Sequence, residues 1–211
     1  MRRFPHISWG YSGLALVLWV LGACAHDHRV KIDPELYVRE SNVGHGLPVR
    51  VQVVDRRSHR AIYKKTSGPH LPLAGRPLNQ VSIYPGTPVD DPVKEAIQTG
   101  LARLGFKPVE GERSYQRVLR VEIRLLRLFY QFENPRLKIP EKNVRLRTAL
   151  DVIAQSPRQT FKRRYETQMD KSQNLLTGEF KNQQFINNGL SLTLQKMFED
   201  PELLDFLSPK T

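Results

Sequence analysis

Residues 119–124, with the sequence Leu-Arg-Val-Glu-Ile-Arg, decide the fold because apolar and charged side chains alternate along them. A period of two is typical of a β-strand that buries one face and exposes the other. Leu119, Val121 and Ile123 should therefore face the core. The apolar phase shifts at Leu125-Leu126, as a β-bulge would make it do.

Two further strand patterns follow the first one. The second carries apolar Val144, Leu146, Leu150 and Val152, and the third carries apolar Phe161, Tyr165 and Met169. Pro135 and Pro140 break the chain between the first two strands, and Ser156-Pro157 turns it between the second and third. Three successive strands joined in this way predict an antiparallel meander.

A strand and a helix are expected before the meander. Valines alternate with polar residues from Val49 to Val53, and a short apolar piece, Val81 to Tyr84, is expected to return to the same sheet. Asp90-Asp91-Pro92 offers a helix N-cap followed by a proline in the first turn. The apolar stripe of this helix comprises Val93, Ala96, Ile97, Leu101 and Leu104. Gly105 should end the helix, and Phe106 should pack back on it.

A second helix is expected from about Phe180 to Glu199, followed by a short turn that starts at Asp200-Pro201-Glu202. The order strand, helix, three strands, helix predicts a single α+β domain. Its mainly antiparallel sheet should have about four strands. A helix with one apolar stripe must bury it against the sheet, so both helices should pack on one face.

The N-terminus carries an export signal. Arg2 and Arg3 precede an apolar run of about 11 residues, Tyr11 to Leu21, which has the length of a signal-peptide core and is too short to span a membrane. Leu21-Gly22-Ala23-Cys24 then places the only cysteine of the chain after two small residues. The alternative is a lone buried cysteine at the end of an N-terminal helix.

This segment resembles the bacterial lipoprotein signal. The resemblance implies cleavage of residues 1–23 and a mature N-terminus at Cys24 that carries S-diacylglycerol and an N-acyl chain. Several acyl chains anchor a protein stably, whereas one chain holds only marginally. Ala25 follows the cysteine, where an aspartate would imply retention at the inner membrane. We therefore expect a protein anchored to the outer membrane at its periplasmic face.

The stretch after the cysteine shows little periodicity. We expect residues 24–47 to form a lipidated, flexible tether, which as a coil would span roughly 25–30 Å, and residues 48–211 to form the single periplasmic domain. A second cysteine is absent from the sequence, which excludes a disulfide framework.

The formal net charge is +12 for the whole chain. Cleavage would remove Arg2 and Arg3 and leave +10. A strongly basic protein favours anionic partners such as nucleic acid, lipid headgroups, lipopolysaccharide or acidic polymers.

Several patterns together resemble the YajG-type bacterial lipoproteins. They are the valine strand that ends in Asp55-Arg56-Arg57, the helix that ends in residues 101–106, the strand from Leu119 to Leu125, Tyr165, the helix entered by Phe180-Lys181-Asn182, and residues 200–204. The resemblance implies an outer-membrane lipoprotein of unsettled molecular role, with no catalytic or cofactor residues to carry over. The basic loop from Ser58 to Pro77 and the cationic sheet depart from the simplest family pattern.

The residues favour neither an enzyme nor a metal site. The cysteine is committed to lipid, and the sequence has no G-x-S-x-G, H-E-x-x-H or phosphate-binding glycine motif. His26 and His28 lack the further ligands that a stable metal site needs. We predict no catalytic residues, no metal and no cofactor other than the covalent lipid.

The best candidate for a working surface is the polar face of the meander. It should carry the cations Arg120, Arg124, Arg145, Arg147, Lys162 and Arg164 against the carboxylates Glu122, Asp151 and Glu166. One interpretation is a solvated face whose charges oppose each other across strands. The other is a docking surface for an anionic envelope polymer or a periplasmic protein, because the arginine fork binds carboxylate and phosphate.

Three classes of function therefore compete. The leading one is a non-enzymatic binding or accessory module, and the second is a purely structural envelope lipoprotein. A nucleic-acid-binding protein is the least favoured, because the aromatic-studded basic patches of such modules are missing from the sequence.

Overall fold

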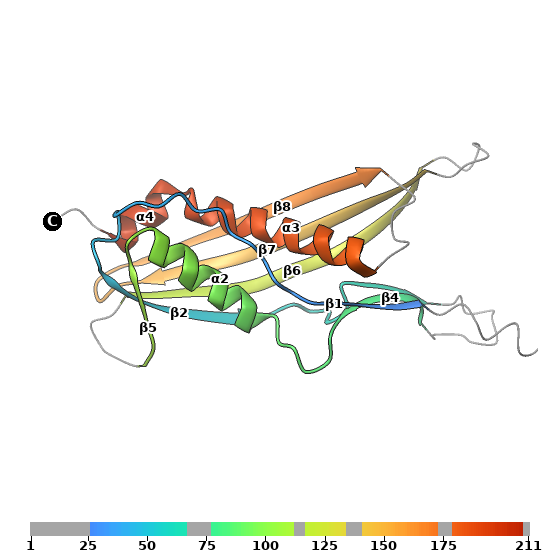
Figure 1. Cartoon of the computed structure of the whole chain (residues 1–211), viewed down its shortest axis with the longest axis horizontal. Coiled ribbons are helices and arrows are strands. Elements are labelled where there is room, and N and C mark those ends of the chain that lie inside the picture. The colour runs from blue at the N-terminus through green and yellow to red at the C-terminus, as the bar shows by residue number, and fades with distance from the viewer. Residues whose placement is uncertain (1–25, 67–76, 112–116, 134–140, 173–178, 209–211) are drawn as a thin grey trace, which may run out of the picture.

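Two β-sheets and three helices make up the described part of the chain (Figure 1). The computed structural model describes residues 26–66, 77–111, 117–133, 141–172 and 179–208. The predicted cleavage motif and the predicted lipidation site, Leu21 to Cys24, lie outside these residues.

The larger sheet has five strands in the order β5-β2-β6-β7-β8. They are β2 (Pro48–Asp55), β5 (Lys107–Val109), β6 (Arg117–Glu133), β7 (Glu141–Gln155) and β8 (Thr160–Ser172). β6, β7 and β8 pair antiparallel, which confirms the meander, while β2 runs parallel to β5 and β6. The predicted α+β class is thus confirmed. The additional strand is β5, whose three residues are too few to show an alternation.

The predicted bulge lies in β6. The pairing with β7 shifts between Ile123 and Leu125. Before the shift the buried residues are Leu119, Val121 and Ile123, and after it they are Leu126 and Leu128. The extra residue therefore moves the second half of β6 by one position and keeps its leucines on the core face.

All three helices lie on one side of the larger sheet (Figure 1). α2 (Asp90–Arg103) contacts β2, and α3 (Glu179–Phe198) contacts β7 and β8. The short α4 (Pro201–Leu207) follows α3 directly. Phe198 of α3 packs so closely on Gly100 of α2 that a Cβ at this glycine would lie 2.6 Å from the ring. The two long helices are therefore side by side on the same face, as predicted.

The C-terminal end of α2 agrees with the prediction, but its N-terminal end does not. Gly105 has a φ of 81°, its N–H donates to Ala102 O, and the N–H of Phe106 donates to Leu101 O at 3.0 Å. This Schellman ending confirms the predicted stop. The prediction of an aspartate N-cap is wrong, because Val89 already has helical dihedrals and no side chain caps the helix. Asp90 and Asp91 lie in the first turn, where negative charge interacts favourably with the helix dipole.

A second, three-stranded sheet has the order β1-β4-β3. It consists of β1 (His26–Val30), β3 (Tyr63–Thr66) and β4 (Pro77–Ile83). The apolar piece Val81 to Tyr84 was expected in the main sheet, but most of it belongs to β4 of this smaller one. The two sheets meet where Leu128 N donates to Ile62 O at 2.9 Å, and Ile62 is fully buried.

The N-terminal segment, residues 26–47, is part of the domain. The prediction of a flexible tether is wrong for this segment, because β1 pairs in parallel with β4 and the side chains of Val30 and Ile32 are buried. Amide side chains of α3 hold the backbone that follows β1. Gln183 Oε1 accepts from Lys31 N at 3.1 Å, Asn187 Nδ2 donates to Lys31 O at 3.1 Å, and Asn187 Oδ1 accepts from Asp33 N at 3.0 Å.

The end of the N-terminal segment is joined to the end of α2. Gly44 N donates to Leu104 O at 2.8 Å, and Gly46 N donates to Gly105 O at 2.7 Å. The two backbones approach so closely that a Cβ on Gly44 would lie 2.3 Å from the amide nitrogen of Phe106. The segment therefore shares hydrogen bonds with the core of the domain instead of moving freely beside it.

Replacing this glycine tests the corrected boundary. We expect Gly44→Ala to lower the free energy of unfolding by about 2–3 kcal/mol, because a main-chain contact must open. Gly46→Ala is the matched control: its Cβ would meet nothing within 4 Å, and only the left-handed φ should cost about 1–2 kcal/mol. Urea unfolding of the mature domain, followed by circular dichroism, measures both variants. A Gly44→Ala protein as stable as wild type would show that this segment does not pack on the domain.

A buried carboxylate fastens the C-terminal end of the structure to the sheet. Asp200 caps α4 by accepting from Glu202 N at 3.0 Å, and its side chain is 5% exposed. Arg163 of β8 donates to Asp200 Oδ2 at 2.7 Å, and the hydroxyl of Tyr165 donates to the same oxygen. Burial opposes ionisation of Asp200, but these hydrogen bonds outweigh it and lower the pKa of its carboxyl. Burial and the neighbouring Asp200 raise the pKa of Tyr165.

Removing this charge should weaken the fold. We expect Asp200→Asn to lower the free energy of unfolding by about 2–4 kcal/mol, because Arg163 and Tyr165 lose a buried acceptor. Glu202→Gln is the control: Glu202 also pairs with Arg163 but is 69% exposed, so this change should cost about 0.5 kcal/mol or less.

The same carboxylate makes stability depend on pH. The folded-state pKa of Asp200 lies below the unfolded value of about 3.9, so its contribution is present above about pH 5 and is lost as the pH falls through the folded pKa. Urea unfolding at pH 7 and at pH 3 should show a smaller loss of unfolding free energy for Asp200→Asn than for wild type. An equal loss of unfolding free energy in the two proteins would contradict the link between protonation of Asp200 and stability.

Candidate functional site

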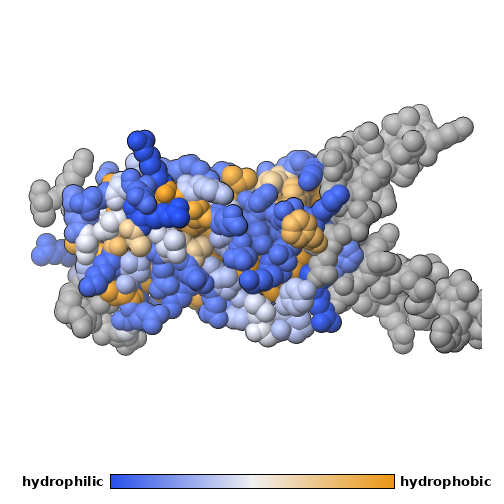
Figure 2. Space-filling model, viewed as in Figure 1, coloured by the Kyte–Doolittle hydropathy of each residue, from blue (hydrophilic) through white to orange (hydrophobic). Residues whose placement is uncertain are grey.

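One face of the larger sheet is left uncovered by the helices. We call the part of this face on β6, β7 and β8 the arginine face. The pairing registers place five of the predicted residues there: Arg120 on β6, Arg145 and Arg147 on β7, and Lys162 and Arg164 on β8. Arg124, the residue at the bulge, reaches the same face through its ion pairs with Glu122 and Asp151. Figure 2 shows the opposite, helix-covered side of the molecule, where apolar residues are scattered among hydrophilic ones.

Ion pairs hold one half of the arginine face. Glu122, whose side chain is only 7% exposed, lies between Arg120 at 2.7 Å and Arg124 at 2.6 Å. Arg124 also donates from Nε to Asp151 Oδ2 across the strand pair, at 2.6 Å. Arg164 reaches Asp151 from the other side, at 3.8 Å. Two carboxylates are therefore shared by three arginines, and this part of the face is largely compensated in charge.

A further pair joins β7 and β8. Arg145 Nε donates to Asp170 Oδ1 at 2.6 Å. This hydrogen bond is the main reason that the pKa of the Asp170 carboxyl is lowered, and the charges of Arg145 and Arg147 lower it further. Asp170 was not among the carboxylates predicted for this face, although it continues the alternation of Lys162, Arg164 and Glu166 along β8.

Two cations of the face, one in each half, lack such partners. The side chains of Arg147, in the half with Arg145, and of Lys162, in the row of Arg120, make no hydrogen bond or ion pair with any residue that the structure describes. Arg127 of β6 lies directly opposite Arg147 in the register, and both side chains are exposed. Arg127 stacks over the ring of Phe129, with its guanidinium carbon 5.1 Å from the ring centroid.

Arg127 is a cation of this face that sequence reasoning missed. It has the wrong parity in an uninterrupted alternation that starts at Arg120, and it reaches the face only because the bulge shifts the second half of β6. The shift of apolar phase at Leu125-Leu126 contained the signal, because continuing the period of two beyond it assigns Arg127 to the polar side.

The pair of Arg127 and Arg147 has the charge and the donor groups that an anion site would need. Directly opposite residues of an antiparallel pair have Cβ atoms about 4.5–5.5 Å apart, and like charges at this distance destabilise the sheet. Two guanidinium forks on one exposed surface offer bidentate donors to a carboxylate or phosphate placed between them. An anionic group would therefore relieve a repulsion as well as gain hydrogen bonds.

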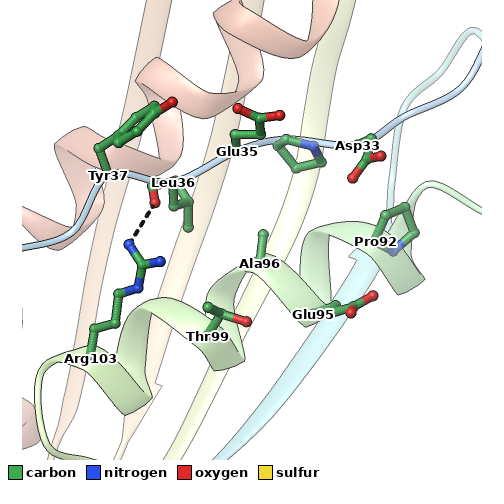
Figure 3. A pocket seen from close by; sticks show the side chains of 10 residues that line it. Asp33, Glu35, Leu36, Tyr37, Pro92, Glu95, Ala96, Thr99 and Arg103 are labelled. Atoms are coloured by element: carbon green, nitrogen blue, oxygen red, sulfur yellow. Dashed lines mark hydrogen bonds between the residues drawn. The ribbon is translucent and has the colours of Figure 1, made fainter.

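A second candidate is a groove of about 390 Å³ between α2 and the N-terminal segment (Figure 3). Asp33, Glu35 and Tyr37 come from the N-terminal segment, and Glu95 and Thr99 come from α2. Arg103 Nη1 donates to Leu36 O at 3.3 Å across one end. In Figure 3, Tyr37 and Glu35 point away from α2, so they do not converge with Thr99 on a common centre. The groove lacks the converging groups that a catalytic site needs.

His28, one of the two histidines in β1, lies beside α3. His28 Nδ1 lies 3.0 Å from Asn182 Nδ2. Among the described residues, no group of three or more His, Cys, Asp or Glu side chains could hold a metal ion. In the same parts of the chain, none of the helices has the length and apolar character to cross a membrane.

The comparison with solved structures finds a distant likeness to several bacterial proteins. A putative neuraminyllactose-binding hemagglutinin homolog from Helicobacter pylori is 9% identical, with a TM-score of 0.46, and the match covers 82% of this chain and 96% of that one. A minor lipoprotein from Acinetobacter baumannii is 13% identical, with a TM-score of 0.36 and coverage of 77% and 91%. The rare lipoprotein B from Shewanella oneidensis is 12% identical, with a TM-score of 0.35 and coverage of 75% and 89%.

No curated protein matches the sequence significantly. A family model does match, and its description is "uncharacterized lipoprotein". The match extends over residues 34–208, which includes both long helices, all five strands of the larger sheet and the Asp200 cap. The chain therefore belongs to this family of uncharacterized lipoproteins, the YajG family.

Proposed function

We propose that the chain is a lipoprotein anchored through acylated Cys24 to the periplasmic face of the outer membrane, where it acts as a non-enzymatic binding module. Membership of a lipoprotein family supports the anchor, and the sequence Leu21-Gly22-Ala23-Cys24 supplies its attachment point. The binding surface is the arginine face, and its partner is an anionic component of the envelope, either a periplasmic protein or a polymer.

The single observation that supports a binding role is that Arg127 and Arg147 lie directly opposite each other on neighbouring strands. Most other cations of the face are paired with carboxylates, which is the arrangement expected of a surface that only has to stay soluble. Two exposed arginines placed opposite each other have no such explanation, because the repulsion between them costs stability. An anionic partner would convert this cost into binding energy.

A purely structural envelope lipoprotein is the second candidate, and the ion pairs favour it. Glu122, Asp151 and Asp170 together bind Arg120, Arg124, Arg145 and Arg164. In this interpretation the charges keep the sheet soluble and set its register, and the protein has no saturable partner. The two candidates differ in what a charge reversal at Arg147 should do.

A photo-crosslinker next to Arg147 tests the binding role. Gln168 is exposed on β8 and lies directly opposite Arg147. With p-benzoyl-phenylalanine at Gln168, illumination of cells that naturally produce the protein should give a specific adduct. We expect Arg147→Glu to reduce the adduct about tenfold or more, because the reversed charge repels an anionic partner. The unfolding free energy should change by only about 0.5 kcal/mol or less, since the side chain is exposed.

Arg158→Glu is the matched control, because it makes the same change in net charge at an exposed position in the turn between β7 and β8. This variant should leave the adduct unchanged. A discrete band would identify a protein partner, and a broad smear would identify a polymer. Equal adduct yields from the two variants and wild type, or no adduct at all, would favour the structural lipoprotein.

The anchor is tested separately with Cys24→Ala. The wild-type protein, expressed in a Gram-negative host, should be found in the outer-membrane fraction, and the mass of its N-terminus should show an acylated Cys24. The variant should lose both the acyl mass and this fractionation, because the acyl chains supply the membrane affinity. Wild-type protein that is soluble and unmodified would overturn the lipoprotein assignment, and inner-membrane fractionation would overturn the sorting that Ala25 implies.

A further inference from the structure

The attachment point of the lipid lies close to a rigid part of the domain. β1 begins at His26, two residues after Cys24. Two residues span at most about 7 Å whatever their conformation, and the four residues to His28 span at most about 14 Å. A membrane that holds Cys24 must therefore come close to β1 and to whatever packs beside it.

The neighbour of β1 is the N-terminal turn of α3. Asn182, which is fully buried, contacts His28 through Nδ2 at 3.0 Å, and Gln183 binds the backbone of Lys31. Figure 1 shows β1 and the start of α3 at one end of the molecule, with α4 and the C-terminus at the other. The first turn of α3 and the acylated cysteine thus belong to the same end.

An exposed aromatic residue lies in this turn. The side chain of Phe180 is 68% exposed, whereas Phe106, Phe185 and Phe198 are buried and Phe129, Phe161 and Phe206 are at least partly buried. Phe180 is two residues from Asn182, and its neighbour Lys181 is also exposed. Single exposed apolar residues are common on protein surfaces. Phe180, however, lies at the end of the domain where the proposed lipid anchor is attached.

From this geometry we infer that the β1/α3 end of the domain docks on the phospholipid surface, with Phe180 inserted at the interface beside the lipid anchor. The inference rests on the proposed acylation of Cys24. The apolar side chains of helices that lie in a membrane interface are buried about 5–10 Å into the boundary of headgroups and acyl chains, and we expect the same depth for Phe180. Lys181, next to it, suits the phosphate groups of the headgroups.

Docking at this end fixes the orientation of the whole domain. β6, β7 and β8 lie along the long axis of the molecule, and one end of each strand is at the same end as β1 (Figure 1). The long axis of the sheet then points away from the membrane. The arginine face is roughly perpendicular to the membrane surface, where a periplasmic partner can reach it. A long flexible tether would leave this orientation random.

The mature chain offers a clean probe, because both tryptophans, Trp9 and Trp19, precede Cys24. Phe180→Trp therefore gives a single-tryptophan protein after cleavage. The acylated protein would be reconstituted into vesicles of phosphatidylcholine and phosphatidylglycerol, with and without brominated acyl chains. We expect a blue-shifted emission and about a twofold loss of intensity with the brominated lipid, as for an aromatic side chain at the interface.

Leu192→Trp is the matched control. Leu192 is on the same helix and is 43% exposed, but it is twelve residues farther along, which is about 18 Å. Its emission should stay water-like and unquenched. The circular dichroism spectrum and melting temperature of both variants must match those of the wild type, so that a difference in quenching reports position and not unfolding. Equal quenching at the two positions would overturn docking by one end, since the helix would then lie flat on the membrane.

Failure of the anchor and failure of the docking give different results. Protein without acyl mass that does not bind the vesicles would overturn both the lipoprotein assignment and the inference that rests on it. If the Phe180→Trp variant is acylated and vesicle-bound but its emission is unquenched, the anchor stands and the docking is overturned. A blue shift that occurs without vesicles and grows with protein concentration would also overturn it, because a second copy of the chain would then cover this position.

Discussion

The antiparallel pairing of β6 with β7 is the constraint on which the rest of the structure depends. It runs from the pair Val118 and Gln155 to the pair Glu133 and Glu141. Side chains alternate between the two faces, so a single register decides which residues enter the core and which form the arginine face. A slip by one residue would bury arginines against α3 and expose leucines. The surface charge pattern is therefore fixed by the same register that fixes the core.

α3 connects this sheet to the N-terminal segment. Near its middle, Gly189 lies so close to β7 that a Cβ would be 2.3 Å from Leu146, and Thr193 bonds to Thr148. In its first half, the amides of Gln183 and Asn187 hold the N-terminal segment. A single helix thus contacts both the N-terminal segment and the sheet, so it fixes the position of one relative to the other.

The sequence predicted most strongly where a periodic pattern repeats. The meander, the bulge and the two long helices all came from alternation or helical spacing, and the register then placed five of the six predicted cations together. It failed for residues 26–47, because their partners are amide side chains and helix-end carbonyls far away in the chain, and such partners leave no period. The prediction from sequence missed Arg127 because the one extra residue at the bulge changes which face each later residue of β6 points to.

The uneven pairing of charges decides where an anion can gain binding energy on the arginine face. At Arg124 a ligand would have to displace Glu122 and Asp151, and at Arg145 it would have to displace Asp170, so the hydrogen bonds gained would replace equivalent ones. At Arg127 and Arg147 no carboxylate of the described residues has to be displaced. By this argument an anion that binds the face would gain most at this pair of arginines. A face with the same number of cations but complete pairing would be soluble, stable and indifferent to anions.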